Sequence, residues 1–393
     1  MWRLMGTDDN TEASQPGQAR SAVTVRCWRR KTTTLLAGLF ASYLSVMAAQ
    51  AQGFADPLQT PALQYVAALD RLPMQALVSR GGENLVAVGM RGVILRSDNA
   101  GASWQQVPVP VGSDLLAASF VSANQGWAAG HDGVILATND GGQTWSKQLD
   151  GRQALEQLTR YYRDDAQLDA QVREDLIRQL EVNLKPGPVL PFLSVLFVDA
   201  DHGLASGPFG MLVATDDGGR HWRPALHQID NPDFYHLNAI ARIGERLFIT
   251  SEQGIVFTAS VDERQFRPVA TGHVGSFFSL AGNGSVILAG GLGGVLFGSH
   301  DAGEHWAAID SPLSQLVTRI TFDAQNQRFI AVSAAGELLS LGADLSDARL
   351  LKTQAPMLYT DVVSLPGKLV FAGIQGMAAD SSPTLQAQQE AQP

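Results

Sequence analysis

A ten-residue phrase that recurs seven times constrains the fold of this chain more than any other sequence feature. In each copy an apolar run leads to a small residue, two variable residues, a Gly and another apolar run, as in VAVGMRGVIL, WAAGHDGVIL and LAGGLGGVLF. The closing Gly falls at positions 92, 133, 210, 254, 294, 336 and 376, so successive copies are 41, 77, 44, 40, 42 and 40 residues apart. A period near 40 residues predicts stacked copies of one small unit rather than two or three unrelated domains.

A second motif follows the first at a constant offset and has the pattern Ser/Thr-x-Asp-x-Gly-x-x-Trp. It occurs as TNDGGQTW, TDDGGRHW and SHDAGEHW, and as the near copy SDNAGASW, in which Asn99 replaces Asp. Because Ser, Thr and Asp side chains bond to backbone NH groups in tight turns and Gly accepts a positive φ, the motif predicts a structural turn, the Asp-box, whose Trp packs between sheets. This role is assigned to Asp140, Trp145, Asp217, Trp222, Asp301 and Trp306. Sugar or metal binding by these aspartates is the less favoured alternative.

Each unit contains four short β runs, which in the second unit are Leu115–Val121, Gly126–Gly130, Val134–Thr138 and Trp145–Gln148. Four strands per unit and seven units predict an all-β protein, a seven-bladed β-propeller over residues 52–379. The last unit lacks an Asp-box and a fourth strand, because the chain turns polar at Asp380 and residues 380–393 read as a disordered tail. The stretch Pro61–Ala68 is a candidate for the missing outer strand, which would close the ring and protect its edges.

The step of 77 residues marks an insertion at residues 151–188. Within it, Gln153–Leu184 contains no Gly or Pro, and its apolar residues recur at helical spacing up to Leu184. The Pro and Gly residues that follow end the helical pattern, and Asp164-Asp165 is expected to divide it into two helices. A cap packed on its own blade and a docking element for a partner are both consistent with this pattern.

The first 51 residues have the features of a signal peptide. Basic residues between Arg26 and Lys31 precede an apolar run from Leu35 to Ala49, and Ala49-Gln50-Ala51 has the small-x-small pattern of a cleavage site. We expect cleavage after Ala51 and a periplasmic or secreted protein. An uncleaved membrane anchor is the alternative, although the apolar run is short for a membrane span.

Charge and composition exclude several partner classes. The chain has a formal net charge of −10, and beyond residue 51 it carries 22 Lys and Arg against 35 Asp and Glu. Because no basic residues cluster beyond residue 51, we do not expect nucleic acid as a partner. The single Cys lies in the segment expected to be removed, and the eight His show neither HxH nor HxxxH spacing. We therefore expect no disulfide, no metal site and no cofactor.

Strand order assigns each turn of a blade to one of two faces. The first and third turns, including the Asp-boxes, share one face, which we call the Asp-box face. The second turns and the blade-to-blade connections, including the insertion, share the opposite face, which we call the second-turn face. Function is expected on the second-turn face, because the Asp-box residues are satisfied within their own hairpins.

Aligning the innermost strands gives one column of small or polar residues that suits a channel lining: Ala76, Ala117, Ser194, Asn238, Ser279, Arg319 and Asp361. Arg319 and Asp361 fall in neighbouring blades. The two are predicted to form either a structural ion pair or a ligand site at the channel mouth. In that site Arg319 would bind an anion, with Asn238, His236 and Tyr359 as further binding residues.

The motifs WAAGHDGVILATNDGGQTW and LASGPFGMLVATDDGGRHW resemble the family of photosystem II stability/assembly factors, and the resemblance covers residues 60–379. Within that family the chain resembles a branch from non-photosynthetic bacteria and, more distantly, it resembles sialidase-like propellers. The resemblance implies an exported, non-enzymatic scaffold with membrane-associated protein partners, including an exporter-associated role. We expect a monomer in which the insertion at residues 151–188 is a candidate docking element.

The alternative function is an Asp-box glycoside hydrolase of the sialidase or glucanase type. Its acid/base pair would come from Asp132, Asp233, Glu252 and Asp361, all expected on the second-turn face or at the channel mouth. A sialidase also needs three Arg that clamp a carboxylate, and the chain has no Arg-Ile-Pro motif. The scaffold is therefore the favoured interpretation, since a fold alone does not imply an activity.

Overall fold

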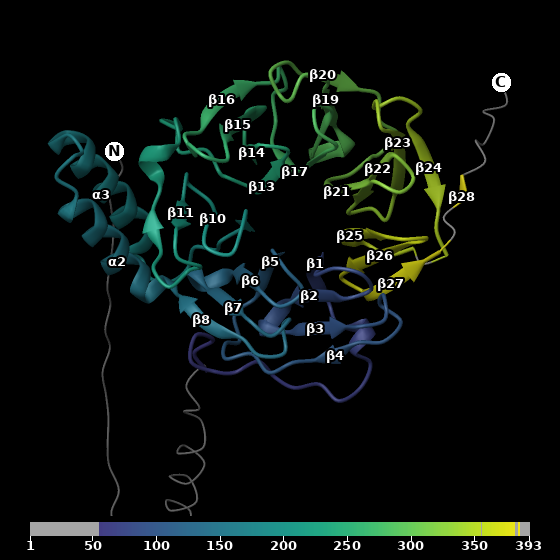
Figure 1. Ribbon diagram of the computed structural model, residues 1–393, viewed down its shortest axis with the longest axis horizontal. Helices are drawn as coiled ribbons and strands as arrows, with labels where there is room; N and C mark the ends of the chain where they lie inside the picture. Colours follow the sequence, from purple (N-terminus) through teal and green to yellow (C-terminus); the bar gives the residue numbers. More distant parts are fainter. Residues whose placement is uncertain (1–54, 355, 382–383, 386–393) are drawn as a thin grey trace, which may run out of the picture. The chain divides into compact units, whose positions relative to one another are not determined.

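Seven antiparallel sheets arranged in a ring form the body of the protein (Figure 1). The computed structural model describes residues 55–354, 356–381 and 384–385, so the expected signal peptide and most of the expected tail lie outside the described residues. The predicted seven-bladed propeller is confirmed. In the second blade the observed strands differ from the predicted ones by no more than one residue at either end.

The blades follow one another in chain order, and the first strand of each is innermost. Blades 1 to 3 comprise β1–β4 (Met74–Ser79, Leu85–Gly89, Ile94–Ser97, Gln105–Gln106), β5–β8 (Leu115–Phe120, Gly126–Gly130, Ile135–Thr138, Ser146–Leu149) and β9–β12 (Ser194–Phe197, Gly203–Ser206, Leu212–Thr215, Arg223–Pro224). Blades 4 and 5 comprise β13–β16 (Ala239–Ile243, Arg246–Thr250, Ile255–Ser260, Arg267–Ala270) and β17–β20 (Phe277–Gly282, Ile287–Gly291, Leu296–Ser299, Ala307–Ile309). Blades 6 and 7 comprise β21–β24 (Val317–Asp323, Arg328–Ser333, Leu338–Gly342, Arg349–Lys352) and β25–β27 (Tyr359–Leu365, Lys368–Gly373, Gly376–Asp380).

The hydrophobic core is divided into clusters that lie between adjacent blades. The second and third strands supply most of it, and β2, β6 and β10 are buried along their whole length. These runs are apolar on both sides, because each sheet packs against a neighbour on either face. Between blades 2 and 3, for example, Trp127 stacks on Phe197 with ring centroids 3.4 Å apart, and Phe197 meets Trp222 edge-on.

The ring closes by side-chain contacts between blades 7 and 1, without a shared strand. Innermost strand β25 contacts β1, as each innermost strand contacts the next. Asp361 Oδ2 accepts a hydrogen bond from Leu77 N at 2.9 Å, and Thr360 Oγ1 donates to Met74 O at 2.8 Å.

The prediction that Pro61–Ala68 completes blade 7 is wrong. This stretch forms no strand and instead lies beside blade 1, where Ala62 N donates to Val109 O and Tyr65 N donates to Gln106 Oε1. Within the expected tail, Thr384–Leu385 form β28, which pairs with β24 of blade 6 rather than with blade 7. Among the described residues, blade 7 therefore has three strands.

The insertion forms two helices, α2 (Gly151–Asp164) and α3 (Ala170–Leu184), which confirms the predicted division near Asp164-Asp165. Asp150 and Asp169 cap their N-termini by accepting hydrogen bonds from backbone NH groups of the first turn. Figure 1 shows both helices at the outer rim, and α2 contacts the outermost strand β12. None of the helices in the described part of the chain is long and apolar enough to span a membrane.

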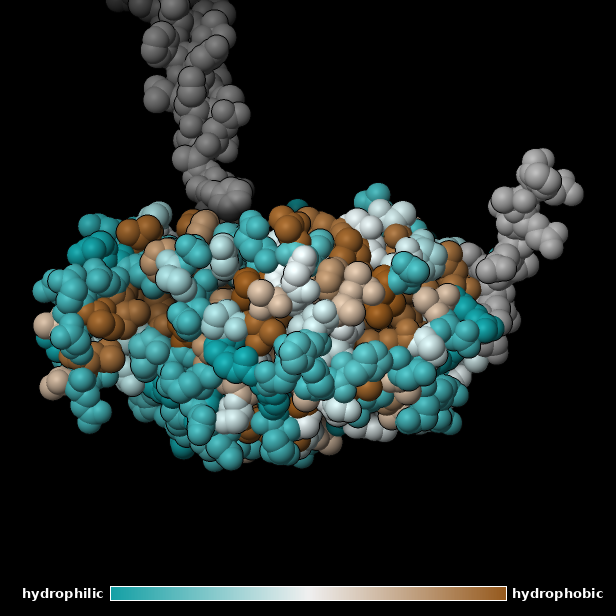
Figure 2. Space-filling view, turned by 90° about the horizontal axis from the view of Figure 1, so that it is seen from above, coloured by the Kyte–Doolittle hydropathy of each residue, from teal (hydrophilic) through white to brown (hydrophobic). Residues whose placement is uncertain are grey.

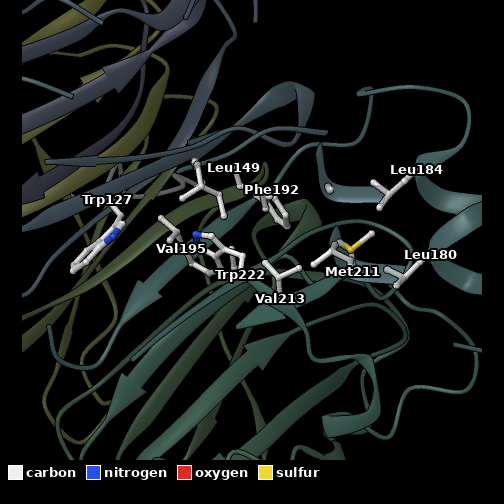
Figure 3. Close-up of a cluster of buried hydrophobic side chains, with 14 of the residues drawn as sticks. Trp127, Leu149, Leu180, Leu184, Phe192, Val195, Met211, Val213 and Trp222 are labelled. Atoms are coloured by element: carbon white, nitrogen blue, oxygen red, sulfur yellow. The ribbon is translucent and has the colours of Figure 1, made fainter. Parts of the chain in front are cut away.

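Buried side chains join the helices to blades 2 and 3. Leu158, Tyr162 and Leu180 are completely buried, in a cluster that also contains Trp127 and Trp222. Figure 3 shows Leu180 and Leu184 of α3 lying beside Met211 of blade 3. Polar contacts add to this packing, since Gln157 Nε2 donates to Trp222 O at 2.7 Å and Tyr162 Oη accepts from Leu226 N at 3.1 Å. The insertion therefore covers the outer edge of blade 3, the next blade along the chain.

Candidate functional site

The Asp-boxes have the structural role predicted for them. Asp140 Oδ1 accepts hydrogen bonds from Gln143 N and Thr144 N, both at 2.9 Å, and from Thr138 Oγ1 at 2.8 Å. Trp145 Nε1 donates to Gly142 O. Burial alone would raise the pKa of Asp140, but hydrogen bonds from Thr144, Thr138 and Gln143 outweigh it and lower the pKa to about 2.

The other two boxes repeat these contacts, with His replacing the last Thr. His221 Nδ1 lies 2.6 Å from Asp217 Oδ2, and His305 Nδ1 lies 2.7 Å from Asp301 Oδ2. Ser299 and Thr215 bond their aspartates as Thr138 does. Trp306 Nε1 donates to Gly303 O, whereas the equivalent buried Nε1 of Trp222 has no partner.

The predicted channel-lining column holds neighbouring blades together. Ser194 Oγ accepts from Ile240 N of the next blade at 3.1 Å, and Ser279 Oγ accepts from Ile320 N at 2.8 Å. Asn238 Nδ2 donates to Phe277 O at 2.9 Å. Ser194, Ser279 and Asp361 are buried, so the polar character predicted to face a channel serves contacts between blades instead.

Arg319 and Asp361 form the predicted ion pair, with Arg319 Nε 3.1 Å from Asp361 Oδ1. The Asp361 side chain is 5% exposed, whereas that of Arg319 is 48% exposed. Burial raises the pKa of Asp361. The positive charge of Arg319 and hydrogen bonds from the backbone NH groups of Leu77 and Val362 lower it, but they offset only part of the effect of burial. Because Asp361 also binds Leu77 N of blade 1, the structure supports the interpretation of a structural pair.

The remaining predicted binding residues do not gather around that pair. Tyr359 is 1% exposed and packs on Phe371 between blades 6 and 7, so its assignment to a channel mouth is corrected to a core position. Burial also raises the pKa of Tyr359. His236 lies in the connection between blades 3 and 4, where its backbone NH donates to Glu252 Oε2 at 2.8 Å.

Three of the four carboxylates considered for glycoside hydrolysis are already engaged within the fold. Asp132 Oδ2 accepts from Ser113 Oγ at 2.6 Å, Glu252 accepts from His236 N, and Asp361 is buried as described. In the described residues, no group of three or more His, Cys, Asp or Glu converges as a metal site would require.

The exposed hydrophobic residues are unevenly divided between the two faces. Among the described residues, eight large exposed hydrophobics lie on the second-turn face, and none lies in the turns of the Asp-box face. The eight are Met90, Val189, Phe209, Phe234, Val274, Leu292, Leu358 and Ile374. Figure 2, seen along the plane of the ring, shows hydrophobic residues gathered toward one side and a mostly hydrophilic opposite side. Such one-sided exposure is typical of a binding surface.

Two phenylalanines of this surface lie on adjoining loops, and neither was among the predicted binding residues. Phe209 lies in the second turn of blade 3 and Phe234 in the connection to blade 4, with 47% and 48% of their surfaces exposed. The His236 ring packs on Phe209 with centroids 4.8 Å apart, and His236 Nδ1 lies 3.0 Å from Glu252 Oε2 without hydrogen-bond alignment. We call Phe209, Phe234, His236 and Glu252 the aromatic corner.

One sequence signal points to the aromatic corner. Three of the other second turns carry Arg91, Asp132 or Gln253 at the position that Phe209 occupies, and each of these residues has a positive φ. An aromatic residue in place of a polar one is the local exception within the repeat.

Comparison with known proteins gives a consistent family assignment. A sequence model of the family described as "Photosynthesis system II assembly factor YCF48" matches residues 82–164 and 175–341, more than half of the chain. A stretch of 47 residues is 47% identical to the chloroplastic photosystem II stability/assembly factor HCF136 of Cyanidioschyzon merolae, covering 12% of this chain and 11% of that protein. A stretch of 148 residues is 26% identical to the photosystem II assembly lipoprotein Ycf48 of a Synechococcus species, covering 37% of this chain and 44% of that protein. These matches span less than half the length of either relative.

Solved structures agree on the fold. One described as "YCF48 bound to D1 peptide" matches with a TM-score of 0.58 and 16% identity, over 84% of this chain and all of the other. A structure of YCF48 from Cyanidioschyzon merolae matches with a TM-score of 0.56 and 13% identity, over 80% and 97% of the two chains. At these identities the likeness concerns the propeller architecture.

Proposed function

Because this chain belongs to the family of the photosynthesis system II assembly factor YCF48, we propose that it is a non-enzymatic assembly scaffold that binds segments of membrane-protein partners. The observation that carries the proposal is the placement of eight exposed hydrophobics on the second-turn face, with none in the opposite turns of the described chain. A structural relative described as bound to a D1 peptide supports recognition of a protein segment by this fold.

The partner of this chain is proposed to be an envelope membrane protein other than photosystem II, for example an exporter. The helical insertion, which adds two helices to the regular repeat, supports a partner of its own. Its two helices bury their inner faces against blade 3, so docking would use the outward residues, such as Val172 (47% exposed) and Val182 (69% exposed).

Export is proposed from the N-terminal sequence, with cleavage after Ala51. The mature protein would then begin at Gln52, three residues before the described part of the propeller. Mass spectrometry of the N-terminal peptide from the periplasmic fraction tests this: a peptide beginning at Gln52 is expected. A peptide from within residues 1–51, recovered from the same protein, would contradict cleavage at that site.

Site-specific photo-crosslinking tests the binding face. A photoreactive phenylalanine analogue at Leu292 or Ile374 reports on the second-turn face, and the same analogue at Gln143 or Glu263 reports on the Asp-box face; all four positions are exposed. We expect crosslinks to membrane proteins from the first pair alone. Equal yields from both pairs, or crosslinks from the Asp-box face alone, would refute the proposal.

A further inference from the structure

Both phenylalanines of the aromatic corner occupy a backbone conformation that side chains rarely adopt. Phe209 has φ 56° and Phe234 has φ 55°, which lie in the left-handed region. For a bulky L-residue this conformation costs free energy, and aromatic side chains have no polar group to bond the local backbone. Each ring stays about half exposed, so burial within the fold does not offset that cost. Strain of this kind is most common at functional sites.

The two residues lie on adjoining loops. Gly210, next to Phe209, donates its NH to Tyr235 O, next to Phe234, at 3.1 Å. A Cβ added at Gly210 would lie 3.5 Å from the Phe234 Cα. The two loops therefore lie side by side, so one partner segment can reach both phenylalanines.

Hydrogen bonds from the surrounding elements hold this patch in place. Gln179 Nε2 and Asn183 Nδ2 of α3 both donate to Phe209 O, at 3.2 and 3.3 Å. Asn231 bonds Tyr235 twice, accepting from its NH and donating to its carbonyl at 3.0 Å. A patch fixed before binding loses less conformational entropy when a partner docks.

The three loop segments that form the patch are acidic. The segments 207–211, 227–236 and 251–254 contain Asp230, Asp233 and Glu252 but no Lys or Arg. Tyr235 donates its hydroxyl proton to Asp233; burial and this hydrogen bond raise the pKa of Tyr235, and the negative charge of Glu252 adds to the effect. Glu252 Oε2 accepts from His236 N at 2.8 Å, so this carboxylate lies beside the same loop. An anionic lipid surface would be repelled here, whereas a cationic protein segment would be attracted.

The geometry points to the aromatic corner as the docking site for a segment of a partner protein that places an apolar side chain beside Lys or Arg. The apolar side chain packs against Phe209 and Phe234, and the cationic group lies near Glu252 and Asp233. This inference rests on the proposed function and names the class of partner segment that the second-turn face recognises.

Selection from a phage-displayed library of random dodecapeptides tests the inference on the full mature chain. The selected peptides are expected to combine an aromatic or branched aliphatic residue with Lys or Arg. Their affinity should fall at least tenfold for the double variant Phe209→Ser, Phe234→Ser. It should fall about three- to tenfold for Glu252→Gln, which keeps an acceptor for His236 N but removes the charge.

Val66→Ser is the matched control, because Val66 is completely exposed and lies in the segment before blade 1. This variant should bind the selected peptides with the same affinity as the unmodified protein. Where the double variant does not fold, Phe209→Asn replaces it, since Asn tolerates a positive φ. Vesicles of phosphatidylglycerol form a second arm, and no binding is expected.

Three outcomes would overturn the inference: selected peptides rich in Asp or Glu, equal affinity for the double variant and the unmodified protein, or vesicle binding that depends on Phe209. Peptides that bind the second-turn face independently of both phenylalanines would refute this site and leave the scaffold function intact. The crosslinking experiment tests the whole second-turn face, whereas the peptide selection tests the aromatic corner. Either proposal can therefore be refuted without the other.

Discussion

Single side chains in the Asp-boxes organise whole turns, and Asp140 is the clearest case. Its carboxylate accepts from two backbone NH groups and two hydroxyls within five residues of sequence. The sequence predicts this role, because the residues that make these hydrogen bonds lie close together in the chain. Asn99 in the near copy accepts the equivalent bonds from Ser97 and Ser103. The structural role therefore needs an acceptor oxygen at this position, and either carboxylate or amide provides one.

Lowering the pH is expected to weaken the fold through Asp140. The folded-state pKa is lowered to about 2, below the ordinary value of 3.8, so the stabilisation is present above pH 4 and is lost as pH falls toward 2. We expect Asp140→Asn to lower the free energy of unfolding by about 1 kcal/mol at pH 7, after allowing for solvent screening, and by less at pH 2. Urea unfolding at both pH values measures this, and a difference that grows toward pH 2 would contradict it.

The strain at Phe209 predicts an unusual order of stability among substitutions. Asn tolerates the left-handed region and relieves a cost of about 1–2 kcal/mol, which roughly offsets the lost packing of a half-exposed ring. The Phe209→Ala variant loses the same packing, but Ala does not relieve the backbone strain. Phe209→Asn should therefore be more stable than Phe209→Ala by about 0.5–1 kcal/mol. Thermal unfolding of the two variants decides this, and an equal or reversed order would show that the backbone is not strained.

Among the elements, the helical insertion was the most predictable in outline and the least predictable in placement. Periodicity indicates two helices with apolar faces, but it does not say which blade those faces contact. The structure packs them on the outer edge of blade 3, where Tyr162 Oη accepts from Leu226 N and lies 3.0 Å from His227 Nδ1. That placement depends on contacts 64 and 65 residues apart in sequence, which no local pattern encodes.

Core and surface substitutions in the insertion should differ sharply. Leu158→Ala removes a completely buried side chain and should lower the free energy of unfolding by about 2–5 kcal/mol. Val172→Ala, on the exposed side of α3, should change it by less than about 0.5 kcal/mol. Urea unfolding of both variants measures the difference. Similar small effects would mean that the insertion is not part of the cooperative unit.

At the scale of the whole molecule, the repeat period predicts the number of blades, but the manner of ring closure depends on tertiary contacts. Pro61–Ala68 was predicted to be the closing strand because an outer strand is missing from blade 7. The register of that segment is instead set by Gln106, which bonds Tyr65 N and Leu63 O beside blade 1. The burial of Tyr359 could not be predicted from the sequence either, because it depends on how closely blades 6 and 7 pack.

Asp361 is predicted to be the principal polar link across the closure. Asp361→Ala leaves Leu77 N without its acceptor and should lower the free energy of unfolding by about 2–4 kcal/mol. Asp361→Asn keeps an acceptor and should cost less. Ser279→Ala is the matched control between blades 5 and 6, with an expected loss of about 1 kcal/mol. Urea unfolding measures all three, and a smaller loss for Asp361→Ala than for Ser279→Ala would contradict this role.

The pH dependence of Asp361 has the opposite sign to that of Asp140. Because burial raises its folded-state pKa, folding favours the protonated form, and stability falls as pH rises above 4 toward that raised value. The Asp361→Asn variant lacks this loss, so its stability relative to the unmodified protein should improve as pH rises over that range. A constant difference across the range would show that the carboxylate is not affected by its burial.

Five of the seven second turns place a residue with a positive φ directly before the closing Gly. Four of these residues carry different side chains: Arg91, Asp132, Phe209 and Gln253. A substitution at one of them alters the outward chemistry without touching the packed strands beneath it. Evolution can therefore exchange partners one turn at a time, and a designer can do the same by moving an aromatic residue from one blade to another. In such a ring, a change at an exposed turn position alters the binding surface and leaves the architecture that displays it intact.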